Sequence, residues 1–148
     1  TLHDPDGRAD RINWLVIKCD QDIARLYSAR FNLSITEWRV MAVLGHERGL
    51  SANTVAERTA MDKVAVSRAV SALMGKKFLN RQTDPTDARR SSLKLSAKGY
   101  GVFDQIVPLA LAYEQKILAH LAPEAQNTLL AILNTLEAAE LAEKPGAE

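Results

Sequence analysis

Two arginines, Arg89 and Arg90, follow a predicted turn between two strand-like segments, residues 79–83 and 91–95. Pro85 and the aspartates around it favour the turn, because proline restricts its own φ angle and aspartate side chains bond nearby backbone groups. Guanidinium groups are always charged and bind phosphates or carboxylates through paired hydrogen bonds. The hairpin is therefore expected to lie against something anionic. A solvated hairpin in an unrelated α+β domain is the alternative.

The residues before the hairpin are predicted to form a helix from Asp62 to Phe78, with Asp62 as its N-cap. The expected inward stripe is Val66, Val70, Leu73 and Met74. The first two turns carry Lys63, Val64, Ala65, Ser67 and Arg68. Arg68 could pair bidentately with a guanine, and a lysine in the first turn opposes the helix dipole unless a phosphate lies nearby. Lys76 and Lys77 are expected to be solvated, without a role.

Charge is unevenly distributed along the chain. Residues 58–98 contain 10 basic and 3 acidic residues, a net of +7, whereas the remainder contains 9 basic and 15 acidic residues, a net of −6. A cationic face on an acidic body is typical of nucleic-acid binding, because neutralised phosphates release condensed counterions. The whole-chain net charge of +1 conceals this segregation.

The basic segment has helix-turn-helix proportions. Ser51 caps a predicted helix over residues 52–59, and about three residues join it to the helix that follows. Upstream, Ser34 and Glu37 have the spacing of a capping box, which predicts that a further helix begins at Ile35.

Long helices are predicted on both sides of this region. Apolar residues recur at three- and four-residue spacing over residues 11–31, which predicts a helix. Its expected inward stripe is Ile12, Leu15, Val16, Cys19, Ile23, Leu26 and Tyr27. One helix from Ala97, interrupted or kinked at Pro108, and another from Pro123 to about Glu143 follow the hairpin. The terminal helices are more apolar than one small domain needs, which favours burial in a partner. The predicted fold class is mainly α with a small β-hairpin wing.

Four stretches occur in an order that matches a known family. They are Leu33-Ser34-Ile35-Thr36-Glu37-Trp38-Arg39-Val40-Met41, Met61-Asp62-Lys63-Val64-Ala65-Val66-Ser67-Arg68-Ala69-Val70, Asp84-Pro85-Thr86-Asp87-Ala88-Arg89-Arg90 and Leu95-Ser96-Ala97-Lys98-Gly99. Together they resemble the MarR family of bacterial winged helix-turn-helix transcriptional regulators. The wing of that family often has the pattern Asp-x-Arg-Asp-x-Arg, and Thr86 stands here at the middle arginine.

The resemblance implies a regulator, not an enzyme, that binds a palindromic DNA operator as a homodimer, with half-sites about 10 bp apart. The implied DNA contacts are Lys63, Val64, Ala65, Ser67, Arg68, Asp87, Arg89 and Arg90. Arg89 corresponds to the wing arginine that enters the minor groove, and Asp87 either orients it, forms the turn, or does both. The implied organisation is a dimerisation helix (1–32), a winged helix-turn-helix (33–96) and C-terminal dimerisation helices with a tail (97–148), in one intertwined domain.

The resemblance also implies a small-molecule effector, which is often a phenol or an aryl carboxylate and sometimes an acyl-CoA thioester. The candidate lining of its cleft is Trp14, Lys18, Trp38, Arg39 and His46. Lys18 or Arg39 could pair with a carboxylate, whereas Trp38 is equally expected as a core aromatic residue. A repressor released by such an effector is the leading functional hypothesis.

Two other functional classes stay open. Cys19, the only cysteine, could make the chain a thiol-based redox sensor, although its position in an apolar stripe favours a buried inert thiol. A helical scaffold or enzyme without a DNA role is the third class. His3, His46 and His120 lack metal-ligand spacing, and no catalytic arrangement or cofactor motif is evident. A single cysteine and the lack of a membrane-length apolar run favour a cytoplasmic protein.

Overall fold

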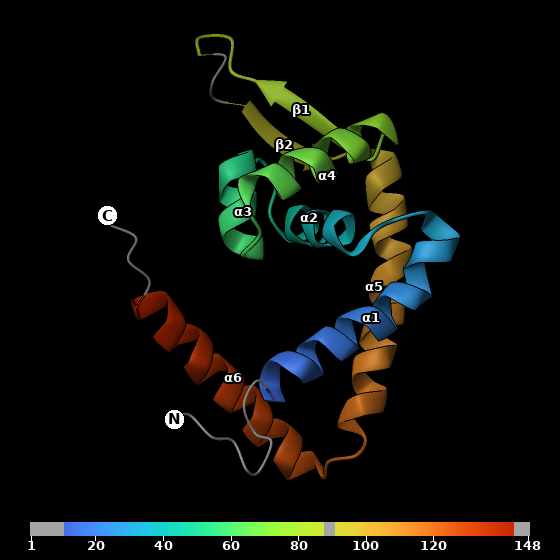
Figure 1. The fold of residues 1–148 in the computed structure, drawn as a ribbon, viewed down its shortest axis with the longest axis vertical. Coiled ribbons are helices and arrows are strands. Elements are labelled where there is room, and N and C mark those ends of the chain that lie inside the picture. Colours follow the sequence, from blue (N-terminus) through green and yellow to red (C-terminus); the bar gives the residue numbers. More distant parts are fainter. Residues whose placement is uncertain (1–10, 88–90, 144–148) are drawn as a thin grey trace, which may run out of the picture. The chain divides into compact units, whose positions relative to one another are not determined.

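A computed structural model describes residues 11–87 and 91–143. The elements are α1 (Arg11–Phe31), α2 (Ile35–His46), α3 (Ala52–Thr59), α4 (Lys63–Gly75), β1 (Leu79–Thr83), β2 (Ser91–Leu95), α5 (Ala97–Leu118) and α6 (Pro123–Glu143) (Figure 1). The predicted fold class, mainly α with a β-hairpin wing, is confirmed. The chain divides into two compact units, Thr1–Ala110 and Leu111–Glu148. None of the described helices is long and apolar enough to cross a membrane.

Side-chain caps determine where the helices of the first unit begin. The Ser34 hydroxyl accepts the Glu37 N–H (3.1 Å), and the Glu37 carboxylate accepts the Ser34 N–H (2.9 Å), so the predicted capping box is present. Ser51 and Asp62 cap α3 and α4 in the same way, through the backbone N–H groups three residues ahead. These bonds satisfy donors that a helix N-terminus otherwise leaves unpaired.

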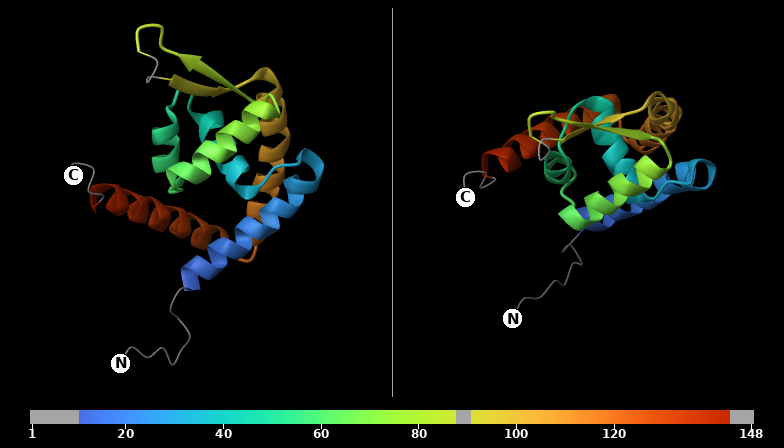
Figure 2. Two further views of the ribbon diagram at one scale, coloured as in Figure 1. Left: turned by 45° about the horizontal axis from the view of Figure 1, so that its top comes forward. Right: turned by 90° about the horizontal axis from the view of Figure 1, so that it is seen from above.

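The hairpin pairs β1 with β2 in antiparallel register, with Leu79 opposite Leu95. A single bridge adds Leu50 to the free side of β2: the Leu93 N–H bonds the Leu50 carbonyl (2.7 Å), and the Gly49 N–H bonds the Leu93 carbonyl (3.0 Å). The base of the hairpin is thus attached to the connection between α2 and α3. Figure 2 shows its turn extending on the side of α3.

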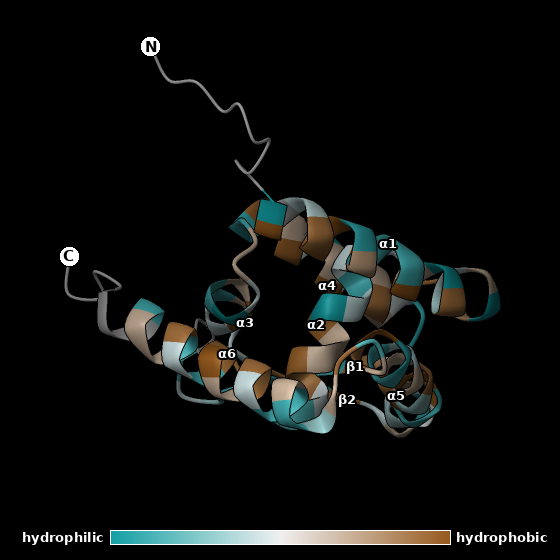
Figure 3. Ribbon diagram, turned by 90° about the horizontal axis from the view of Figure 1, so that it is seen from below, coloured by the Kyte–Doolittle hydropathy of each residue, from teal (hydrophilic) through white to brown (hydrophobic). Residues whose placement is uncertain are grey.

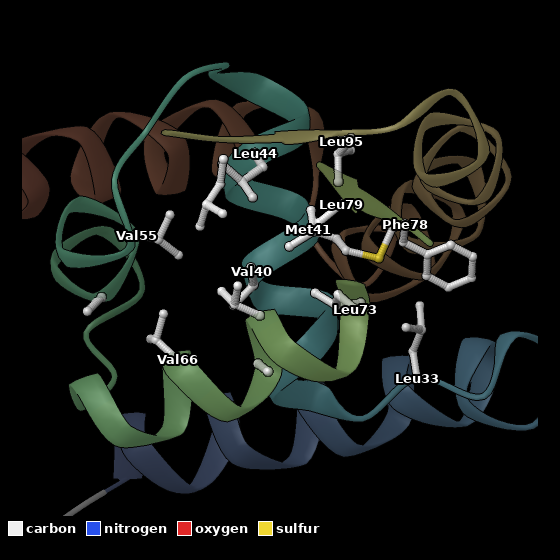
Figure 4. Close-up of a cluster of buried hydrophobic side chains, with 14 of the residues drawn as sticks. Leu33, Val40, Met41, Leu44, Val55, Val66, Leu73, Phe78, Leu79 and Leu95 are labelled. Carbon is white, nitrogen blue, oxygen red and sulfur yellow. The ribbon is translucent and has the colours of Figure 1, made fainter. Parts of the chain in front are cut away.

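The core of the first unit lies between α2, α3, α4 and the base of the hairpin. Figure 4 shows side chains from these elements converging on one another. Its fully buried members include Val40, Met41, Leu44, Val55, Val66, Val70, Leu73 and Leu93. Because α4 uses its inner side for this packing, the first two turns are free to present the opposite side.

The end of α4 differs from the prediction, because the helix stops at Gly75 rather than Phe78. Lys77 adopts a left-handed conformation (φ 67°), so the Phe78 N–H bonds the Leu73 carbonyl and the Lys77 N–H bonds the Met74 carbonyl. This is a Schellman motif, in which glycine usually takes the left-handed position. The prediction that Met74 points inward was also wrong, since it is 37% exposed, and Ala69 is buried on the inner side instead.

The apolar stripe of α1 also differs from the prediction, because most of it faces away from the core. Tyr27 is buried and Ile23 is half-buried, but four members of the stripe are exposed: Ile12, Leu15, Val16 and Leu26. In the second unit, α6 exposes Leu130, Ile132, Leu133 and Leu136. Figure 3 shows the apolar residues along both helices. Exposed apolar surface of this extent indicates an interaction surface.

Candidate nucleic-acid interface and effector cleft

The outward side of α4 carries the residues expected to contact DNA. Lys63, Val64, Ser67 and Arg68 are exposed, and Ala65 is half-buried. The other side of the helix is held by Val66, Ala69, Val70 and Leu73 in the core. A helix fixed along one side, with cations and a hydroxyl on the other, can enter a major groove.

A hollow of about 410 Å³ separates α4 from the start of α2. It is lined by Ala65, Arg68, Ala69 and Ala72 on one side, and by Ser34, Thr36 and Glu37 on the other. The Arg68 side chain therefore stands between the exposed side of α4 and the capped N-terminus of α2.

Lys76 has a structural role that was not expected from the sequence. Its ammonium group donates to both Glu37 carboxylate oxygens (2.9 and 3.2 Å) and to the Asn32 carbonyl (2.5 Å). Burial tends to raise the pKa of Glu37, but the hydrogen bonds from the Ser34 backbone and Lys76 outweigh burial, and the pKa is lowered. Lys76 thus ties the end of α4 to the start of α2 and the end of α1.

The described part of the wing turn is organised by Asp84. Its carboxylate accepts the Thr86 hydroxyl (2.7 Å) and the Thr86 N–H (2.8 Å), and these bonds lower the pKa of Asp84. Thr86, at the position of a family arginine, therefore stabilises the turn. Asp87 is half-buried, and its N–H bonds the Asp84 carbonyl (3.3 Å). Arg89 and Arg90 lie outside the described residues, so their predicted groove contacts stay predictions.

A second cavity, of about 330 Å³, opens between α1, α2 and α3. Its apolar wall consists of Ile23, Tyr27, Ile35, Trp38, Ala42 and Val43, and its polar wall consists of Asp20, Arg39, Arg58 and Thr59. The Arg39 guanidinium forms an ion pair with Asp20, and Arg58 pairs with Glu47. Of the five candidate effector contacts, Trp38 and Arg39 line this cavity.

The other three candidates lie elsewhere. Trp14 and Lys18 line a separate hollow along α1. His46 is exposed and packs edge-on against Phe103, with ring centroids 6.0 Å apart. Helical spacing could have separated Trp14 from Trp38, because three turns of α1 lie between Trp14 and the buried Tyr27.

Aromatic packing fixes Trp38 at the cavity wall. Its ring lies 5.7 Å from Tyr27 and 5.9 Å from Phe103, measured between centroids, so it is both a packing residue and a cavity residue. Burial, followed by the neighbouring Asp20 charge, raises the pKa of Tyr27 to about 12, so its hydroxyl stays protonated at neutral pH. Cys19 is half-buried on α1 rather than fully buried.

Comparison with known proteins identifies the family. Residues 31–90, which carry α2, the helix-turn-helix and the wing, match the sequence model of the MarR family. The chain belongs to the MarR family. Members of the MarR family are DNA-binding transcriptional regulators, not enzymes, and the resemblance seen in the sequence is thereby confirmed.

Individual MarR-related proteins resemble the chain over most of its length. A putative transcriptional regulatory protein for the hcr operon of Thauera aromatica is 27% identical over 97 residues, which span 66% of this chain but only 58% of that protein. The crystal structure of a MarR/EmrR family regulator from Acinetobacter is 24% identical, covers 93% of this chain and 97% of that one, and has a TM-score of 0.80. The Staphylococcus aureus MepR–DNA complex is 19% identical, covers 89% and 97%, and has a TM-score of 0.78.

Proposed function

We propose that the chain is a transcriptional repressor that binds a palindromic operator as a homodimer and is released by a small aromatic effector. The observation that carries the proposal is the side of α4 opposite the core, where Lys63, Ser67 and Arg68 are exposed together. The net charge of +7 over residues 58–98 supports a polyanionic partner.

The homodimer is supported by the exposed apolar residues of α1 and α6. A large apolar side chain left in water forgoes roughly 1.5–3 kcal/mol of burial free energy, so several on one helix favour association. A second copy of the chain offers matching surfaces, and a two-fold dimer places two α4 helices for two half-sites. Among similar structures, MepR is solved as a DNA complex.

The effector is supported by the cavity between α1, α2 and α3. It combines an aromatic wall with a few polar groups, which is the usual composition of a small-molecule site. The PcaV regulator of Streptomyces coelicolor, 23% identical with a TM-score of 0.75, is solved in complex with its natural ligand.

Operator binding by variants tests the proposal. A duplex is first selected from a random pool, and Arg68→Ala is then compared with Arg25→Ala, which removes an arginine from α1 whose side chain is 77% exposed. We expect Arg68→Ala to weaken binding about tenfold or more, because a lost bidentate contact costs roughly 1–3 kcal/mol, and Arg25→Ala to have little effect. Equal losses would mean that the exposed side of α4 does not bind DNA.

Salt dependence and spacing complete the test. Binding by the native chain should fall with a log–log slope steeper than about −3, because on the order of six to eight cations from two protomers would lie near phosphates. A selected duplex with a single half-site would contradict the palindromic operator.

A further inference from the structure

Asp20 occupies the guanidinium group that an anionic effector would need. We propose that the cavity between α1, α2 and α3 takes a monocyclic aryl carboxylate, and that Asp20 competes with this ligand for Arg39 and so sets its affinity. The inference rests on the effector-responsive function proposed above and assigns the chemistry of its site.

The size and walls of the cavity define the ligand body. Its volume of about 330 Å³ is near the lower end of the range of about 300–1,000 Å³ for small-molecule sites. One aromatic ring with few substituents suits this volume. Trp38 offers the ligand an aromatic wall that is already held between Tyr27 and Phe103, so little side-chain freedom is lost on binding.

The charges of the lining favour an anion. Two guanidinium groups, Arg39 and Arg58, face one carboxylate, Asp20, which leaves a net charge of +1 among the lining residues. Glu47, which pairs with Arg58, does not line the cavity. A neutral ligand would leave this excess charge without compensation.

The Asp20–Arg39 pair is exchangeable. The Arg39 side chain is 42% exposed and the Asp20 side chain 34%, and ion pairs at such exposure contribute little free energy because water screens them. A ligand carboxylate can therefore replace Asp20 with the same bidentate geometry. Asp20 then stays close to the new anion, and this like-charge repulsion lowers the affinity of every anionic ligand.

The experiment uses the fluorescence of Trp38 in a Trp14→Phe background, which removes the only other tryptophan. Benzoate and its neutral analogue benzamide are titrated into proteins carrying Asp20→Asn or Asp22→Asn. Asp22→Asn makes the same charge change on the same helix but outside the cavity, where Asp22 pairs with Arg25. We expect Asp20→Asn to tighten benzoate binding about three- to tenfold, with benzamide unchanged and Asp22→Asn without effect.

Several results would overturn the inference. Unchanged benzoate binding in Asp20→Asn, an equal change for benzamide, or no benzoate binding by any variant would each do so. Arg39→Gln should remove the preference for benzoate over benzamide, whereas Arg58→Gln should retain most of it. The reverse result would assign the carboxylate to Arg58 and refute the role of Asp20.

Operator binding by the same variants, measured without ligand, separates this inference from the proposed function. Asp20→Asn protein that binds the operator normally but has no preference for benzoate refutes the inference alone. Protein that gains benzoate affinity but binds no selected duplex refutes the proposed function alone.

Discussion

Gly99 in the first turn of α5 packs directly against the backbone carbonyl of Phe78. A Cβ atom at residue 99 would lie 2.2 Å from the Phe78 oxygen. The same carbonyl accepts the Ser96 N–H (2.9 Å), while the Ser96 hydroxyl accepts the Gly99 N–H (3.0 Å) and donates to the Lys77 carbonyl (2.7 Å). The start of α5 is therefore fixed to the segment between α4 and β1.

Gly99→Ala should lower the free energy of unfolding by about 1–3 kcal/mol, because the added methyl group overlaps a backbone oxygen that cannot rotate away. Gly101→Ala is the matched control, since a Cβ there meets nothing within 4 Å. In the same helix this control should stabilise by about 0.5–1 kcal/mol through helix propensity. Urea unfolding of both variants makes the comparison, and equal stabilities would refute the close packing.

Lys77→Gly should raise the free energy of unfolding by about 0.5–1 kcal/mol. A left-handed residue other than glycine costs roughly 1–2 kcal/mol, part of which is offset by the greater backbone entropy of glycine in the unfolded chain. Ala60→Gly should act in the same direction, because Ala60 is also left-handed (φ 56°). Ala72→Gly, inside α4, should instead destabilise by about 1 kcal/mol, and a loss of stability in Lys77→Gly would contradict the assigned conformation.

Glu37→Gln should destabilise the protein at neutral pH by about 1–3 kcal/mol, because it removes a charged acceptor that is 8% exposed from three hydrogen bonds. The pKa of Glu37 is lowered by folding, so its stabilisation is present above the unfolded value of about 4.3 and disappears as the pH falls through the folded value.

Unfolding measured from pH 7 down to pH 3 should therefore show a smaller loss of stability in Glu37→Gln than in the native chain. Glu47→Gln serves as the control, because Glu47 is far more exposed than Glu37 and its ion pair should contribute little. Parallel pH profiles for the native chain and Glu37→Gln would show that this carboxylate does not titrate differently on folding.

Leu133→Glu combined with Leu136→Glu should prevent dimer formation, because both charges would be placed on the exposed apolar surface of α6. Sedimentation velocity at micromolar concentration should show a monomer or unfolded chain. Thr135→Glu, on the opposite side of the helix, should remain dimeric. A folded dimer of the double variant would mean that α6 does not contribute to association.

The fold was predictable where its signals are local. The caps Ser34, Ser51 and Asp62, together with the apolar periods between them, predicted the helix starts, and both strands have the predicted bounds. The end of α4 was missed because a lysine occupies the left-handed position that glycine usually marks. The pattern of α1 was assigned to the core because a stripe of apolar residues does not tell whether its own chain or another covers it.

The candidate site was predictable only in part. The contact surface on α4 follows from one helical period, so its exposed residues could be named in advance. The Lys76–Glu37 and Arg39–Asp20 pairs join residues 39 and 19 positions apart, and no local spacing indicates such partners. Asp20 was missed for this reason, although it lies beside Cys19 in a helix that was correctly bounded.

The β-hairpin has a further consequence for how the chain avoids unwanted polymers. Within the described residues, β2 has a neighbour on each side, whereas β1 pairs only with β2. The outer strand exposes Asn80, Arg81, Gln82 and Thr83. A short strand with a charge at its centre is a poor template for adding a strand from another molecule. Fibre-like growth through the sheet is therefore discouraged, and association between copies is left to the apolar helices.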